Sequence, residues 1–84
     1  MTTKTITTKN LYEKHENPIG ELVQEACKYR SELRLNVGTK KINPKSMMFV
    51  LYLPLGGGDE IEIEANGGDE AEAVAALENF LTCR

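Results

Sequence analysis

Apolar residues recur with a helical period in two stretches of the chain. In the first, Ile19, Leu22, Val23 and Ala26 occupy positions i, i+3, i+4 and i+7, which share one face of a helix. Pro18 precedes them and suits the first turn of a helix, where a missing backbone N–H costs nothing. The pattern predicts a helix that begins near Pro18 and buries this face.

The second helical stretch lies near the end of the chain. Its core face is formed by Val74, Leu77 and Leu81, with Ala73 and Phe80 flanking them. Asp69 and Glu72 come just before, with the D-x-x-E spacing of a capping box. We therefore expect a last helix whose start is capped by these two acidic residues.

Four shorter stretches have the composition or the alternation of strands: residues 3–8, 32–37, 40–43 and 60–66. In the last of these, isoleucines and an alanine face inward, and Glu60, Glu62 and Glu64 face solvent. Gly38 and Thr39 suit a tight turn between the second and third strands, which would form a hairpin. Residues 9–14 are expected to be a loop.

The apolar run at residues 47–53, "MMFVLYL", is ambiguous, because periodicity alone does not distinguish a strand from a helix here. Ser46 as a cap and the nearby Pro44 favour a short helix. The predicted order is then β-α-β-β-α-β-α, an α+β fold with a four-stranded antiparallel sheet and helices packed on one face.

Length and composition narrow the possible functions. The 84 residues are expected to form a single domain, residues 1–84, with one modest core. A net charge of −3 argues against nucleic-acid binding, and no apolar run is long enough for membrane insertion. Two cysteines without CxxC spacing and one histidine make a metal site improbable, and no cofactor is indicated. The threonine-rich N-terminus lacks a signal core, so we expect a cytoplasmic protein.

Three blocks of the sequence resemble one known family. "KHENPIGELVQEA" carries His15 and Pro18, "KINPKSMMFVLYLPLGGGDEIEI" carries Lys45 and Ser46, and "ANGGDEAEAVAALENFL" forms the last segment. Together, and without gaps between them, they resemble HPr, the histidine-containing phosphocarrier of the bacterial sugar phosphotransferase system. The resemblance covers essentially the whole chain. It implies an HPr-like open-faced β-sandwich, a four-stranded antiparallel sheet with three helices on one face, in a monomer.

The resemblance implies that His15 accepts a phosphoryl group from enzyme I and passes it to enzyme IIA, with Pro18 shaping the helix start. A helix N-terminus is a natural cradle for a phosphoryl group, and neutral imidazole is a suitable nucleophile. The family's arginine two places after the histidine is Asn17 here, which offers an amide and no charge. Glu13, Glu16 and Glu21 add negative charge, so efficient transfer does not follow automatically. On residue types alone, His15 is equally an exposed loop histidine that caps a helix.

The second block carries two further expectations. Ser46 is an N-cap, a regulatory phosphorylation site, or both, and the resemblance implies an HPr kinase/phosphorylase and a transcriptional regulator as partners. The apolar residues after Ser46 cannot all be buried by one short helix. We expect Met47, Met48 and Leu51 to dock partners, the alternative being core and spare apolar surface. An alternative function is therefore a regulatory or adaptor protein, switched at Ser46, that acts by protein–protein contact without efficient phosphotransfer.

Overall fold

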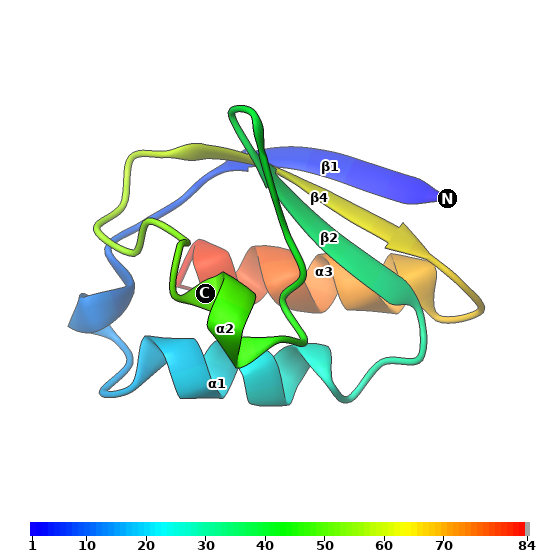
Figure 1. Cartoon of the computed structure of the whole chain (residues 1–84), viewed down its shortest axis with the longest axis horizontal. Coiled ribbons are helices and arrows are strands. Elements are labelled where there is room, and N and C mark those ends of the chain that lie inside the picture. The colour runs from blue at the N-terminus through cyan, green and yellow to red at the C-terminus, as the bar shows by residue number, and fades with distance from the viewer. Residues whose placement is uncertain (84) are drawn as a thin grey trace.

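Four strands form one antiparallel sheet in the order β1-β4-β2-β3. The computed structural model describes residues 1–83. Its elements are, in chain order, β1 (Thr2–Thr7), the 3-10 helix η1 (Leu11–Glu13), α1 (Pro18–Ala26), β2 (Glu32–Val37), β3 (Lys40–Ile42), α2 (Met47–Val50), β4 (Glu60–Asn66) and α3 (Glu70–Leu81). Helices α1 and α3 run side by side beneath the sheet, and α2 lies beside α1 (Figure 1). The predicted four-stranded antiparallel sheet with three helices is confirmed.

The register of the sheet separates apolar from polar side chains. On β4, Ile61 pairs with Ile6 of β1, and Ile63 pairs with Leu35 of β2. These side chains are buried on the helical side of the sheet. Glu60, the first residue of β4, is exposed on the opposite side. Because successive strand residues point to opposite faces, the alternation predicted for residues 60–66 sets this register.

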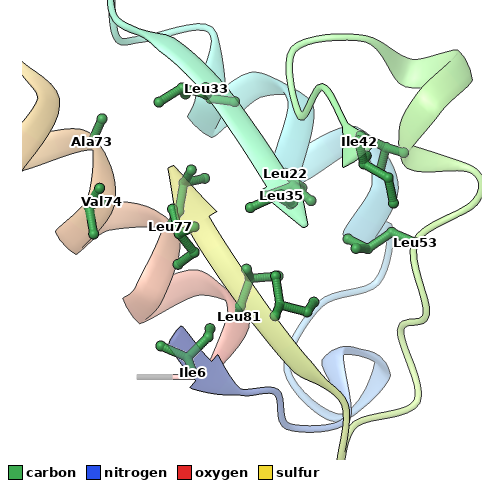
Figure 2. Packing of buried hydrophobic residues seen from close by; sticks show 14 of the residues in the cluster. Ile6, Leu22, Leu33, Leu35, Ile42, Leu53, Ala73, Val74, Leu77 and Leu81 are labelled. Carbon is green, nitrogen blue, oxygen red and sulfur yellow. The ribbon is translucent and has the colours of Figure 1, made fainter. Parts of the chain in front are cut away.

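The core lies between the sheet and the two long helices (Figure 2). Leu22 and Ala26 of α1 are fully buried, while Ile19 and Val23 lie half-buried at the edge of the same face. From α3 the buried residues are Ala73, Val74, Leu77 and Leu81. Burying one such leucine stabilises the fold by about 1.5–3 kcal/mol, so the two helical faces hold the layers together.

The connection between β2 and β3 is the predicted two-residue turn. Val37 pairs with Lys40, which leaves Gly38 and Thr39 as the turn residues. Gly38 has φ +61°, a conformation that glycine adopts without strain at the first position of such a turn. Among residues 1–83, no helix is long and apolar enough to cross a membrane.

One predicted loop contains a helical turn. Residues 9–14 include η1, whose Leu11 is completely buried and donates its N–H to the Leu55 carbonyl at 3.0 Å. Asn10 caps this turn by accepting a hydrogen bond from the Tyr12 N–H at 3.0 Å. A single turn with one buried residue has no periodicity, which is why the apolar pattern did not indicate it.

The capping box predicted for α3 is wrong. Asp69 is the N-cap residue, but its carboxylate makes no capping bond to the helix. It instead accepts the backbone N–H groups of Arg30 and Ser31, at 2.9 and 3.0 Å, and the Ser31 hydroxyl. The Ser31 hydroxyl and these N–H groups lower the pKa of Asp69 to about 2. The side chain thus joins the loop before β2 to the start of α3, a tertiary contact that outcompetes the local one.

Candidate functional site

The loop that carries His15 is fixed to the core by its backbone. The N–H groups of Lys14 and His15 both donate to the Leu11 carbonyl, at 3.3 and 3.0 Å. The Lys14 ammonium group also donates to the Cys83 carbonyl at 3.2 Å, which ties the loop to the end of α3. Since Leu11 is itself buried, the position of the His15 backbone is set by the core.

The His15 ring is stacked on Phe80 of α3. The ring centroids are 4.2 Å apart and the planes differ by 14°. On its edge, Nδ1 lies 3.1 Å from Glu21 Oε1, and the side chain is only 14% exposed. Nε2 is buried and has no hydrogen-bond partner among residues 1–83. His15 is therefore not the exposed loop histidine that residue types alone allowed.

Glu21 bridges the histidine and the start of α1. While one carboxylate oxygen faces His15, the other accepts the Asn17 N–H at 3.1 Å. The Asn17 N–H and the contact with His15 lower the pKa of Glu21, so this carboxylate is ionised at neutral pH. An ionised carboxylate accepts hydrogen bonds and donates none. The Nδ1 atom that faces it must therefore carry a proton.

The N-terminus of α1 has the predicted residues in partly different roles. Pro18 occupies the first helical position, which its fixed φ favours, and its side chain is buried. Asn17 is the N-cap residue, and its side chain accepts the Gly20 N–H at 3.4 Å. The N–H groups of Asn17 and Gly20 therefore already have acceptors, Glu21 and Asn17. A phosphoryl group above this turn would compete with these two side chains for the donors.

An open groove runs from His15 between α1 and α3. Its lining residues are His15, Glu21, Gln24, Glu25 and Lys28 on one side and Ala76, Asn79 and Phe80 on the other. Within it, the Lys28 ammonium group lies 2.8 Å from a Glu25 carboxylate oxygen. The groove gives the His15 ring open space beside its stacked position.

Ser46 precedes α2, but its hydroxyl makes no capping bond, so the predicted side-chain cap is wrong. The turn that enters the helix is formed by Asn43 instead. Its side chain accepts the Lys45 N–H at 3.0 Å and its carbonyl accepts the Ser46 N–H at 3.0 Å. Because α2 is a single turn whose entry is already fixed, the half-buried Ser46 hydroxyl is not needed to form it.

The apolar run after Ser46 divides into buried and exposed residues. Val50 is fully buried and is the only one of Met47–Val50 that is. The predicted docking residues Met47, Met48 and Leu51 are exposed, at 53, 74 and 63%. The other large exposed apolar residues of this segment are Phe49 and Tyr52, and we call these five residues the α2 patch.

Residues beside the two candidate sites contact different parts of α1. His15 precedes the N-terminus of the helix, where Asn17, Pro18 and Glu21 gather. The segment before α2 contacts its other end, where the Cys27 thiol lies 4.0 Å from the Lys45 carbonyl. Residue types singled out His15 but missed Phe80 as its neighbour, since no local spacing connects the two. Glu21 was detectable, because it lies four residues after the N-cap, within reach of the helix start.

Comparisons with known proteins agree on one family. The family model described as the PTS HPr component phosphorylation site matches residues 2–82. The fold is similar to HPr-C-His from Thermoanaerobacter tengcongensis, with a TM-score of 0.83 and 34% identity, covering 96% of this chain and 91% of that one.

It is also similar to the phosphocarrier protein HPr from Bacillus anthracis str. Ames, with a TM-score of 0.84 and 27% identity over 96% of each chain. A third similar structure is Crh, the Bacillus subtilis catabolite repression protein, solved as a swapped dimer. Its TM-score is 0.71 at 32% identity, covering 90% of this chain and 83% of that one. With a family model that spans nearly all of the chain and a fold shared with these proteins, this chain belongs to the HPr family.

Proposed function

We propose that this chain is a cytoplasmic phosphocarrier of the phosphoenolpyruvate-dependent sugar phosphotransferase system. His15 accepts a phosphoryl group from enzyme I and passes it to enzyme IIA. The observation that carries the proposal is the family match together with the place of His15, three residues before Pro18 at the start of α1. In the first transfer a ring nitrogen forms a bond to phosphorus as the bond from phosphorus to enzyme I breaks. In the second, the nucleophile of enzyme IIA forms a bond to phosphorus as the bond from phosphorus to the His15 nitrogen breaks.

The experiment is phosphorylation by enzyme I from the same source in the presence of phosphoenolpyruvate, followed by intact-mass measurement. We expect one added phosphoryl group on the native chain and none on a His15→Ala variant. Because His15 is the only histidine, a label that persists in the variant overturns the assignment. Absence of label on the native chain, with an enzyme I shown to be active on its own carrier, overturns the phosphocarrier role.

A regulatory adaptor is the second candidate, and two observations favour it. Asn17 replaces the family's arginine, and the α2 patch is exposed in a chain that is 32% identical to the catabolite repression protein Crh. In this role, a kinase/phosphorylase phosphorylates Ser46 and a transcriptional regulator binds beside it through Met47, Met48 and Leu51. Phosphate at a helix start is electrostatically favourable, and it also changes the charge next to an apolar surface.

This role is tested by incubation with ATP and an HPr kinase, with Ser46→Ala as the control. We expect label on the native chain only. The chain phosphorylated at Ser46 is then compared with the unmodified chain for binding to a candidate regulator. Equal affinities for the two forms would count against a switch at Ser46.

A further inference from the structure

We propose that Glu21 and Phe80 hold the His15 ring in a closed position, and that release of the ring limits phosphoryl transfer to it. Glu21 is then a positioning residue for the phosphoryl acceptor. This inference rests on the proposed function of His15. The pair that forms the closed position, Glu21 and Phe80, is called the latch below.

The first part of the argument concerns Nδ1. Its distance of 3.1 Å from Glu21 Oε1 makes it a hydrogen-bond donor to an ionised carboxylate. A ring nitrogen that carries a proton has no free lone pair, so it is not a nucleophile. While the contact with Glu21 persists, Nδ1 cannot attack phosphorus.

The second part concerns Nε2, which holds the lone pair of the neutral ring when Nδ1 is protonated. Nε2 is buried, because the ring lies against Phe80, and it has no hydrogen-bond partner among residues 1–83. A phosphoryl donor must approach the nucleophilic nitrogen to about 3–3.5 Å in line with the bond that breaks. In the closed position, therefore, neither nitrogen of His15 is available.

The third part is that the ring has a partner held in place and a space to enter. Glu21 has a second contact that does not involve the ring, since it accepts the Asn17 N–H at 3.1 Å. The groove between α1 and α3 lies beside the ring and is open to solvent. A rotation of the His15 side chain into this groove would expose both nitrogens without a change in the backbone, which Leu11 holds.

The test uses two small reagents, so it does not depend on enzyme I. Phosphoramidate phosphorylates imidazole: a ring nitrogen bonds to phosphorus, the P–N bond of the reagent breaks, and ammonia leaves with the ring proton. Diethyl pyrocarbonate is uncharged: the ring nitrogen bonds to a carbonyl carbon, and the ethyl carbonate that leaves takes the proton and decomposes to ethanol and carbon dioxide. The rate of each adduct on the lone histidine is followed by intact mass.

The variants are Glu21→Gln, Phe80→Leu and a matched control, Glu25→Gln. Glu25 is on the same helix, lines the same groove and pairs with Lys28, so its variant removes one equal charge without touching His15. The net contribution of one hydrogen bond such as that between His15 and Glu21 changes an equilibrium by roughly two- to fivefold. We therefore expect Glu21→Gln to react roughly two- to fivefold faster than the native chain with both reagents. Glu25→Gln should react at the native rate, and Phe80→Leu should also be faster.

A spectroscopic measurement tests the positioning role directly. Nitrogen-15 chemical shifts of the His15 ring should show a protonated Nδ1 in the native chain. In Glu21→Gln this preference should be lost, because the two contacts use different carboxylate oxygens and glutamine has an oxygen at only one of those positions. A native ring with its neutral-form proton on Nε2 would overturn the inference.

The remaining outcomes are also decisive. Equal rates for native and Glu21→Gln with diethyl pyrocarbonate mean that no latch limits the ring. Acceleration by both Glu21→Gln and Glu25→Gln, seen only with the anionic phosphoramidate, assigns the effect to charge repulsion and overturns the latch. If Glu21→Gln does not fold, a native rate in Phe80→Leu overturns it instead. Because the reagents need no partner protein, each result stands apart from the enzyme I experiment, which alone decides the proposed function.

Discussion

At the residue scale, the Glu21 carboxylate determines the hydrogen bonding around His15. Glu21 accepts hydrogen bonds from the His15 ring and from the Asn17 N–H, and its pKa is lowered by both contacts. Counted only as a charge, Glu21 is one of three glutamates that repel a phosphoryl group. In the structure it is instead the hydrogen-bond partner of the residue that the family phosphorylates. The hydrogen bond that Glu21 accepts from the ring therefore matters more for the state of His15 than the negative charge of Glu21 alone.

Replacing Asn17 by arginine should lower the stability of the fold and raise the rate of phosphoryl transfer. Asn17→Arg removes an N-cap, so it should lower the free energy of unfolding by about 0.5–2 kcal/mol in denaturant melts. It also places a forked cation near the site. A charge-assisted hydrogen bond of about 1.5–3 kcal/mol, formed mainly in the transition state, would raise the rate of phosphorylation by about one to two decades.

The rate is measured with a conventional enzyme I at low and high salt, and the gain should shrink as salt screens the exposed charge. Asn17→Ala is the control, since it removes the cap without adding charge. Equal transfer rates for the arginine and alanine variants would show that the missing arginine does not limit transfer.

The site could be predicted from the sequence only as far as it is local. His15, Asn17 and Pro18 lie within one turn, so their roles at the helix start follow from residue type and spacing. Phe80 reaches the histidine from α3, and that contact depends on how the two helices pack. Helix packing is set by the whole core, so no spacing in the sequence reveals it.

At the element scale, the start of α3 is fixed by a tertiary contact. Asp69 accepts three hydrogen bonds from Arg30 and Ser31, and Gly67 in the same connection comes so close to Ser31 that a Cβ would lie 2.6 Å from its hydroxyl oxygen. Removal of the carboxylate leaves these donors without an acceptor. Asp69→Ala should therefore destabilise the fold clearly more than Glu72→Ala, whose residue is exposed and should change stability by less than about 0.5 kcal/mol. Equal losses of stability for the two variants in denaturant melts would contradict this contact and favour the capping box instead.

The same contact predicts a dependence on pH. The pKa of Asp69 is about 2 in the folded chain, against an ordinary value of 3.8. A lowered folded-state pKa stabilises the fold above the unfolded value, and this contribution is lost as the pH falls. The difference in unfolding free energy between the native chain and Asp69→Asn should be constant above about pH 5 and should shrink as the pH falls from 4 towards 2. Melts at several pH values measure it, and a difference that does not narrow in acid contradicts the role of Asp69.

The start of α2 gives a complementary prediction. Ser46→Ala should change the free energy of unfolding by less than about 0.5 kcal/mol, because the hydroxyl caps nothing. Asn43→Ala should cost about 0.5–1.5 kcal/mol, because its side chain accepts the Lys45 N–H. Denaturant melts compare the two variants. A larger loss for Ser46→Ala than for Asn43→Ala would show that the hydroxyl does form a cap.

Elements and caps differ in how far the sequence determines them. The periods of α1 and α3 and the alternation of β4 come from burial of one face, which many residues encode together. A cap depends on one side chain that has several possible partners. Asp69 found partners across the fold, and Asn43 took the place expected for Ser46. Single polar contacts are therefore the part of the fold that pattern does not determine.

At the scale of the whole molecule, α2 carries a buried residue next to exposed ones. Val50 is fully buried, so Val50→Ala should cost about 2 kcal/mol of stability. Leu51 is 63% exposed, and Leu51→Ser should leave stability within about 0.5 kcal/mol. If the α2 patch docks partners, Leu51→Ser should nevertheless weaken binding to enzyme I. Titration calorimetry and melts check both effects, and unaltered binding would assign Leu51 to spare apolar surface.

Within residues 1–83, no helix covers the outer face of the sheet, and the chemistry of this face bears on how copies of the chain meet (Figure 1). Glu60, Glu62 and Glu64 run along the middle of this face, with threonines of β1 opposite them. On the other side of the row, Arg34 of β2 lies opposite Glu64, and Asn36 donates to Glu62 and Glu64. One cation does not neutralise three glutamates, so two copies that approached face to face would repel each other. Copies of the chain that meet in solution should therefore avoid contact between their sheets and leave this face exposed.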